Sequence, residues 1–445
     1  MQSPTTLELS RAPAVIRTIN RCAAQFARRG FRRSFPTAAE LIETARRRTR
    51  LDDFGPGDFF EPLSRLLESC QRDARLNFVG KIALRSDLIR MLSNRLLLER
   101  DRHLYPSIGT QRIREPLFIV GLPRSGTTLL HTLLAADPAH RAPMTWEVMF
   151  PSPPTNQGAQ RRIRETRRSI RYLHWLAPTF RQVHALGAEI PQECIGLTSP
   201  SMLSDQFDTM YRIPSYRTWF LKQDLLPAYQ YHRRFLQHLQ YRQAGDRWIL
   251  KAPAHMFALP ALLSLYPDAL FVQVHRDPLK AIASVSSLIA ILRSIFSDHV
   301  DPTEVGYDAL NYWAETMATF MQQRNGLPAD RFVDIHYSDI RKDPVAAARQ
   351  VYKHFRWELS QDAERRMRMV LSNQPPEENG FHRYDPAQFG LTETEVGSLF
   401  GKYSERFGFS PRPSPVELPS AQAAAGGRSC ESVPKAARSE VPTGY

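Results

Sequence analysis

The residues best suited to chemistry form one short loop, GLPRSG, at residues 121–126. An apolar run at residues 117–120 leads into this loop, and leucines at helical spacing follow it at residues 129–134. A strand, a glycine-containing loop and a helix in this order are typical of an anion-binding site, because backbone N–H groups and the helix N-terminus point at the anion.

The loop differs from one that binds a nucleoside triphosphate. Gly121 and Gly126 have the spacing of a Walker-type P-loop, but Thr127 occupies the position of the lysine and the cation lies inside the loop as Arg124. We therefore expect a ligand that carries a 5′-phosphate and a second anionic group. The candidate contacts are Arg124, Ser125, Gly126, Thr127 and Thr128.

Further polar residues lie at the ends of other expected strands. Lys251 ends the strand of residues 248–251, and Arg276 follows an apolar strand in residues 269–277. Arg276 and Ser284, in the helix that starts at Pro278, are placed to hold a second phosphate, and Lys251 to neutralise a leaving oxygen. Tyr337 lies in a third strand, at about 331–340.

Strands that alternate with helices predict an α/β fold with a P-loop-like, three-layer parallel sheet covered by helices. Ligands bind at the carboxyl ends of such strands, so the candidate residues should converge there. We expect a helical N-terminal region at 1–112 and an α/β domain at 113–411 with a helical, aromatic-rich insertion at about 155–245. Residues 412–445 are rich in Pro, Ser, Ala and Gly and predict a disordered tail.

The composition limits the classes of partner and compartment. The chain has 445 residues and a net charge of +14, and basic residues gather in segments 1–50 and 161–171. The four cysteines are widely spread, which argues against a zinc site or a disulfide framework. The sequence has no apolar run long enough to span a membrane, so we expect no transmembrane helix. We expect a reducing, cytoplasmic location.

At these motifs the chain resembles the sulfotransferase superfamily, in the branch shared by many bacterial enzymes and distantly by tyrosylprotein sulfotransferases. The resemblance covers about residues 113–410. It rests on PRSGTT at 123–128, WILKAP at 248–253, FVQVHRDPLKAIAS at 271–284 and HYSDI at 336–340. It implies 3′-phosphoadenosine 5′-phosphosulfate (PAPS) as the cosubstrate, with the loop on its phosphosulfate, Arg276 and Ser284 on its 3′-phosphate, and Tyr337 near its adenosine. It also implies that Lys251 and Arg124 are catalytic, and that no metal is required.

The general base is less well defined by the sequence. Cytosolic members of the superfamily use a histidine two residues after the strand lysine, where this chain has Pro253. Tyrosylprotein sulfotransferases use a glutamate after the loop helix, and Glu147 lies slightly out of register with it. We expect Glu147 to be the base, with Glu193, Glu189 and His255 as alternatives. Arg383, in a loop before the last helix, is a further candidate for the 3′-phosphate.

The sequence therefore predicts a sulfotransferase that moves a sulfuryl group from PAPS to a hydroxyl or amine on a small-molecule, glycan or lipid acceptor. Two alternatives stay open at this point. A nucleotide-dependent kinase could use the same loop, with Asp277 as a magnesium ligand. A non-enzymatic polyanion-binding protein could use the basic segments, although we expect no nucleic-acid partner.

Overall fold

The computed structural model describes residues 12–29, 35–183, 185–243, 245–373 and 385–409. The described residues up to Phe409 form one compact unit. The expected tail at 412–445 and the candidate residue Arg383 lie outside the described residues. The division into an N-terminal region and an α/β domain stays a prediction.

The described strands form one parallel sheet in the order β2-β3-β1-β4-β5. β1 lies in the centre. The chain runs from β1 to β2 and β3 on one side and then crosses to β4 and β5 on the other. This confirms the predicted α/β class. The bounds are β1 Leu117–Gly121, β2 His140–Arg141, β3 Arg247–Lys251, β4 Leu270–His275 and β5 Phe332–His336.

The central strand contributes to two hydrophobic cores, one on each face of the sheet. Leu117 and Ile119 belong to one core, and Phe118 and Val120 belong to the other. All four side chains are fully buried. Because successive side chains of a strand point to opposite faces, a strand covered on both sides is apolar throughout, as the sequence predicted.

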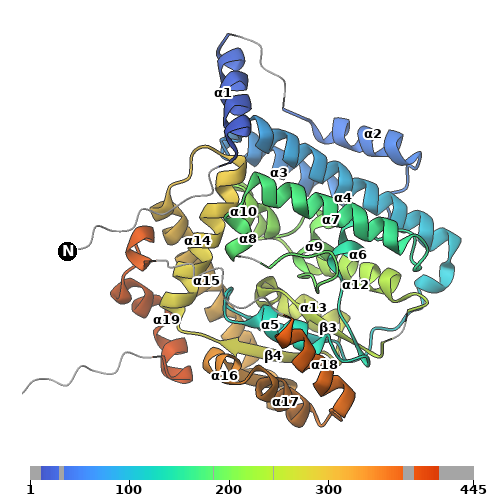
Figure 1. Cartoon of the computed structure of the whole chain (residues 1–445), viewed down its shortest axis with the longest axis vertical. Coiled ribbons are helices and arrows are strands. Elements are labelled where there is room, and N and C mark those ends of the chain that lie inside the picture. Colours follow the sequence, from blue (N-terminus) through green and yellow to red (C-terminus); the bar gives the residue numbers. More distant parts are fainter. Residues whose placement is uncertain (1–11, 30–34, 184, 244, 374–384, 410–445) are drawn as a thin grey trace, which may run out of the picture. The chain divides into compact units, whose positions relative to one another are not determined.

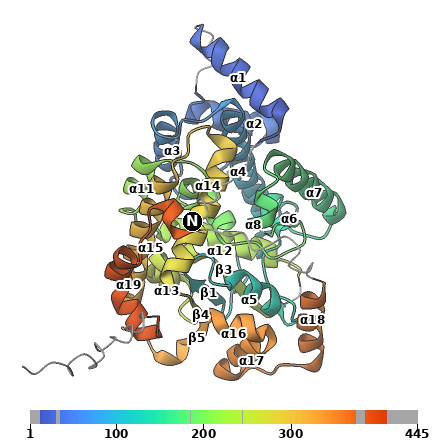
Figure 2. The same ribbon diagram turned by 60° about the vertical axis from the view of Figure 1, so that its left-hand side comes forward.

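Helices cover both faces of the sheet (Figures 1 and 2). The helices that share the core of Leu117 and Ile119 are α5 Thr127–Leu134, α16 Tyr337–Lys342, α17 Pro344–Phe355 and α18 Gln361–Ser372. Of these, α16 and α17 lie below the sheet in Figure 1. The helices on the other face are α12 Leu226–Gln240, α13 Leu259–Leu265, α14 Pro278–Phe296, α15 Pro302–Arg324 and α19 Glu393–Phe407. The 3₁₀ helices include η3 Pro253–Ala258 and η5 Pro386–Phe389.

The N-terminal region is helical, as predicted, and packs on α14 through α4. Thr37 and Glu40 form a capping box at the start of α2, in which each side chain accepts the other residue's backbone N–H. The helices are α1 Ala14–Arg28, α2 Ala38–Thr49, α3 Phe60–Arg72 and α4 Phe78–Leu104.

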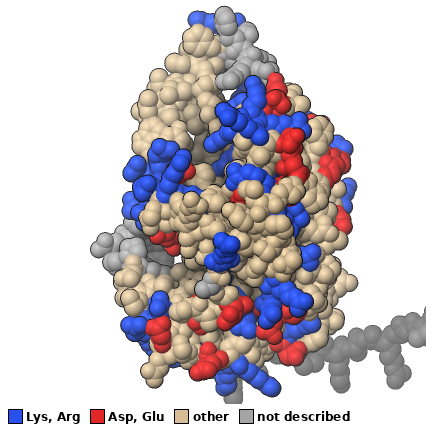
Figure 3. Space-filling view, turned by 90° about the vertical axis from the view of Figure 1, so that its right-hand side faces the viewer, with Lys and Arg blue, Asp and Glu red and all other residues tan. Residues whose placement is uncertain are grey.

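The segment between β1 and β3 contains several helices and the two-residue strand β2. The sequence did not reveal this strand. α7 carries a row of arginines, and Figure 3 shows Lys and Arg side chains in groups on the face to the right of Figure 1. These helices are α6 Thr145–Met149, α7 Ala159–Leu176, α8 Phe180–Val183, α9 Ile195–Thr198, α10 Gln206–Met210 and α11 Pro214–Phe220.

One described helix, α14, is long and apolar enough to cross a membrane by length and composition. Its apolar window is 67% buried inside the protein, and it packs against α15, α4, α10 and α19. These contacts are those of a core helix. α14 and α15 together form a wall beside the carboxyl edge of the sheet.

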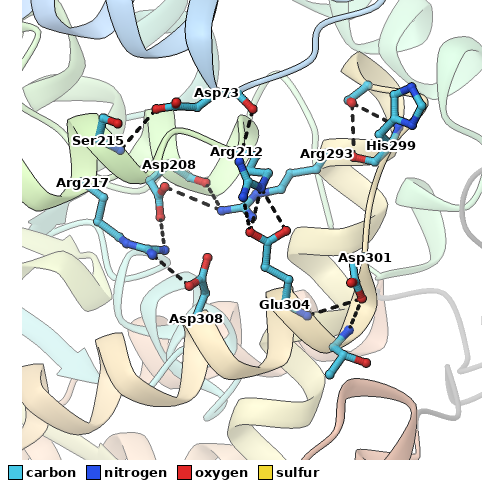
Figure 4. A network of polar contacts seen from close by, with 12 residues as sticks. Asp73, Asp208, Arg212, Ser215, Arg217, Arg293, His299, Asp301, Glu304 and Asp308 are labelled. Carbon is cyan, nitrogen blue, oxygen red and sulfur yellow. Dashed lines mark hydrogen bonds and ion pairs between the residues drawn. The ribbon is translucent and has the colours of Figure 1, made fainter.

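A network of charged side chains joins α10, α11, α14 and α15 (Figure 4). Arg217 lies 3.4 Å from Asp208 and 2.9 Å from Asp308, and Arg293 donates to the Asp208 carbonyl at 2.8 Å. Arg212 pairs with Glu304 at 2.7 Å in the same network. Because Arg217 stands between two carboxylates and is mostly buried, its removal would leave Asp308 without this partner and Asp208 with only the longer contact to Arg293, at 3.6 Å.

We expect Arg217→Ala to lower the free energy of unfolding by about 3 kcal/mol, since two mostly buried carboxylates lose an ion-pair partner. Arg365→Ala is the matched control, because Arg365 also pairs with an aspartate but on an exposed surface. Its effect should stay below about 1 kcal/mol. Urea unfolding of both variants provides the measurement, and equal effects would refute a structural role for the network.

Candidate active site

The loop after β1 is shaped by residues in left-handed backbone conformations. Arg124 has φ 66° and Gly126 has φ 88°. At Gly126 a Cβ atom would stand 2.9 Å from the ring of Tyr337, so any side chain there would push the loop away from α16. α5 begins at Thr127 and directs its first N–H groups toward the loop. The strand, loop and helix follow one another as the sequence predicted, and the role of the loop in anion binding stays a prediction.

The structure brings Arg124, Arg276, Ser284 and Tyr337 together from four elements. The guanidinium of Arg276 donates to the carbonyl oxygen of Arg124, and Arg124 Nε donates to Ser284 Oγ at 3.3 Å. The Arg276 guanidinium also stacks over the Tyr337 ring at 4.4 Å. Arg276 follows β4 and Tyr337 follows β5, so the carboxyl ends of parallel strands position both. Tyr337 is the first residue of α16, whereas the sequence placed it within the strand.

The hydroxyl residues of the loop point in different directions. Ser125 is fully buried, and its Oγ donates to the carbonyl of Leu122 at 2.6 Å, so its hydroxyl stabilises the turn. Thr127 and Thr128 line the adjoining cavity. Of the loop's hydroxyls, those of Thr127 and Thr128 are therefore the ones available to a ligand.

Lys251 is the most deeply buried cation beside the loop. Its side chain is 2% exposed, its Nζ donates to Thr128 Oγ1 at 3.1 Å, and it forms an ion pair with Glu193. The backbone also joins these segments, because Cys194 N donates to the Lys251 carbonyl at 2.9 Å. Burial limits screening of this ammonium by water, and the Glu193 carboxylate balances part of its charge.

Glu147, the sequence-based choice for the base, lies in a different environment. One of its carboxylate oxygens accepts from Arg141 at 2.8 Å, and the other accepts from Met144 N at 3.0 Å. The side chain is buried at the start of α6 and is not among the residues that line the cavity. Glu147 therefore has the contacts of a structural ion pair.

The two other candidates for the base, Glu189 and His255, lie in different surroundings from Glu193. Glu189 lies at the rim of the cavity in an exposed ion pair with Arg167. His255 is buried in the core, where its Nδ1 bonds to Tyr229 Oη at 2.8 Å. Burial, together with the nearby His232 and Lys251, holds the pKa of His255 far below its usual value. Among the candidates, only Glu193 lines the cavity and contacts Lys251.

One large cavity adjoins these residues and has a volume of about 1100 Å³. Its polar side includes Arg124, Thr127, Thr128 and Arg276. Its inner wall is largely apolar and includes Leu288, Ile289, Leu292, Phe296, Tyr312 and Trp313 of α14 and α15. Residues of the segment between β1 and β3, among them Leu173, Phe180, Leu186 and Ile190, line another part of the cavity. The helical spacing of α14 and α15 could not distinguish a cavity wall from ordinary core.

Asp205 is a cavity residue that the sequence did not single out. Its Oδ1 has no hydrogen-bond partner among the described residues. Burial, and then the negative charge of Glu193, raises the pKa of Asp205 to about 7. Within the described part of the chain, no group of three or more His, Cys, Asp or Glu is placed to hold a metal ion.

Comparisons with known proteins agree with this geometry. Residues 116–361, more than half of the chain, match the model of the sulfotransferase family. The omega-hydroxy-beta-dihydromenaquinone-9 sulfotransferase Stf3 of Mycobacterium tuberculosis is 26% identical over 303 residues, which cover 65% of this chain and 74% of that protein.

Two crystal structures are also similar. Sulfotransferase STF1 of Mycobacterium tuberculosis H37Rv is 33% identical, with a TM-score of 0.75, and the match covers 83% of this chain and all of that one. Sulfotransferase STF9 of Mycobacterium avium is 25% identical, with a TM-score of 0.76, and the match covers 84% and 97% of the two chains. These relatives do not favour the kinase or the non-enzymatic polyanion-binding protein. The chain belongs to the sulfotransferase family, and it is a sulfotransferase.

Proposed function

We propose that this sulfotransferase transfers a sulfuryl group from PAPS to the hydroxyl of a largely apolar acceptor. The observation that carries this proposal is that one cavity joins the cationic, hydroxyl-rich loop to the apolar wall of α14 and α15. A polar donor and an apolar acceptor could therefore meet in a single site. PAPS supplies the sulfuryl group and departs as the bisphosphate.

The residues present fit the donor. The N–H groups at the start of α5, with Thr127 and Thr128, would hold the phosphosulfate, and Arg276 with Ser284 would hold the 3′-phosphate. Cations, hydroxyls and backbone N–H groups are the donors that oxyanions require. The contacts among Arg124, Arg276 and Ser284 support this assignment, because they set both anion sites at a fixed separation.

Lys251 stabilises negative charge that develops on the departing oxygen. Its ammonium is buried, so its field is weakly screened by water. Thr128 Oγ1, at 3.1 Å, holds Nζ beside the start of α5. Because the residue is already positioned, little reorganisation is needed during the reaction.

Glu193 accepts the proton of the acceptor hydroxyl. It is preferred over Glu147 because its carboxylate lines the cavity, next to the buried ammonium of Lys251. A base must reach the proton that it removes, and Glu147 is not among the residues that line the cavity. The ion pair with Lys251 keeps the Glu193 carboxylate in place.

The acceptor is a hydroxylated compound with a bulky hydrocarbon body, in the class of lipids or apolar small molecules. The apolar wall favours such a body over a sugar. The relative Stf3 is named for a hydroxylated menaquinone derivative, which is of this class. The location in the cytoplasm stays a prediction.

The anion site is tested by Arg276→Ala. We expect the variant to raise the Kd for 3′-phosphoadenosine 5′-phosphate by about 30- to 100-fold, since it removes a charged donor and loosens Arg124. Isothermal titration calorimetry measures the effect. Arg331→Ala is the control, because Arg331 lies before β5 outside the cavity lining and should leave the Kd unchanged. A change below threefold in Arg276→Ala would remove Arg276 from the proposed site.

The base is tested by a pair of isosteric substitutions. Glu193→Gln should lower kcat by roughly 100- to 10,000-fold while bisphosphate binding persists, because proton removal is lost. Glu147→Gln should leave kcat within about threefold, since its carboxylate is structural. Initial-rate assays with PAPS and a long-chain alcohol distinguish the two. The reverse pattern would restore Glu147 as the base.

Because of the raised pKa of Asp205, we expect the free energy of unfolding to depend on pH. The folded pKa of this residue, about 7, lies above the ordinary value of 3.8, so the folded state favours the protonated form and loses stability as pH rises from about 4 to above 7. Asp205→Asn should therefore raise the free energy of unfolding by about 2 kcal/mol at pH 8 and leave it unchanged near pH 4. Urea unfolding at both pH values measures this, and a pH-independent effect would contradict the raised pKa.

A further inference from the structure

One face of α7 is turned to solvent along the whole helix. It consists of Arg161, Arg164, Arg168, Arg171, Tyr172 and Trp175, all exposed and at helical spacing, and is called the α7 outer face below. The opposite face is buried and includes Ile163, Thr166 and Ile170. The helix is therefore anchored by one side and presents the other as a fixed surface.

The α7 outer face is strongly basic. The helix carries six arginines and one acidic residue, Glu165, which pairs with Arg161 at 3.0 Å. Arg164, Arg168 and Arg171 are spaced by four and three residues and lie in one row. Figure 3 shows such groups of basic side chains standing on one face of the molecule. A row of this kind is complementary to a surface with many negative charges.

Two large aromatic side chains continue this row at the C-terminal end of the helix. Tyr172 is 56% exposed and Trp175 is 46% exposed, and their rings stack at 5.7 Å. Exposed Trp and Tyr next to arginines are the combination found at membrane–water interfaces, where the rings sit among the lipid headgroups.

This end of α7 borders the cavity. Leu173, between the two exposed rings in sequence, lines the cavity wall, and Arg167 pairs with Glu189 at the rim. Ala185 and Glu189 line the cavity and are exposed, so the cavity reaches the surface there. The basic row and the aromatic pair therefore stand beside an opening of the site.

We propose that the α7 outer face docks on an anionic membrane surface and sets the cavity opening against the bilayer from which the apolar acceptor enters. This inference rests on the proposed function, because it supposes an acceptor that resides in lipid. Arginines contact the anionic headgroups, and Tyr172 and Trp175 insert between them. A second copy of this chain is a poor occupant, since a symmetric contact would set two arginine rows against each other. A nucleic acid would gain nothing from an apolar cavity beside the helix.

Sedimentation of the full chain with vesicles tests the proposal. Binding should be strong for phosphatidylglycerol mixed with phosphatidylcholine, weak for phosphatidylcholine alone, and reduced by salt. The triple variant R164Q/R168Q/R171Q should bind the anionic vesicles at least about tenfold more weakly. The control K222Q/K353Q/K402Q removes as many charges from exposed positions elsewhere and should bind within about twofold of the unmodified chain. Equal binding by the triple variant and the control would overturn the proposal.

A second measurement locates the contact. Brominated phosphatidylglycerol should quench part of the tryptophan fluorescence, and Trp175→Phe should abolish that quenching, since Trp175 is the ring placed at the interface. Quenching that persists in Trp175→Phe would assign the contact to another face. Tighter binding of a single-stranded oligonucleotide than of anionic vesicles, lost in R164Q/R168Q/R171Q, would also overturn the proposal.

Calorimetry with 3′-phosphoadenosine 5′-phosphate distinguishes a failure of membrane docking from a failure of the proposed function. The triple variant should bind 3′-phosphoadenosine 5′-phosphate as the unmodified chain does, because none of the three substituted arginines lines the cavity that Arg276 and the loop border. Unchanged binding also shows that the variant is folded. Vesicle binding that fails while bisphosphate binding holds refutes membrane docking alone. Bisphosphate binding that fails in the unmodified chain refutes the proposed function.

Discussion

The central position of β1 between β3 and β4 is the constraint on which the site depends. Because all the described strands are parallel, the segments that follow them emerge at one edge of the sheet. The loop after β1 therefore lies between Lys251, at the end of β3, and Arg276, just after β4. Reversal of the strand order at β1 creates the crevice that such sheets use for ligands. No single segment of the chain contains the site.

Two contacts turn this crevice into a site with defined geometry. Arg276 holds the left-handed Arg124 through its carbonyl, and Lys251 holds Glu193 through an ion pair. Each contact joins segments that are far apart in sequence. Pairing of buried charges offsets their loss of hydration, and it keeps each group ready beside the cavity. The charged network of Asp208, Arg217, Arg293 and Asp308 lines another part of the same cavity.

Much of this arrangement could be predicted from the sequence, because its determinants are local. The loop and the residues that end the strands are encoded by short motifs, so the sequence alone indicates Arg124, Lys251, Arg276 and Ser284, whose roles stay predictions. The choice between Glu147 and Glu193 as the base could not be made from local sequence, because it depends on tertiary contacts. Glu193 lies in an irregular segment whose position depends on the backbone bond from Cys194 to Lys251, and no periodicity reveals that bond. The inward-facing hydroxyl of Ser125 and the short strand β2 likewise depend on tertiary contacts.

In the proposed mechanism one cavity holds both an oxyanion site and an apolar wall. The most direct test is therefore how the rate of sulfuryl transfer depends on the length of the acceptor's hydrocarbon chain. Sulfuryl transfer from PAPS should be measured with primary alcohols of increasing chain length, alongside oligoethylene glycols of equal length. The account predicts that kcat/KM rises roughly fourfold for each methylene until the cavity is filled, and that the glycols are poor acceptors. A rate that is independent of alkyl length, or equal for the glycols, would contradict it.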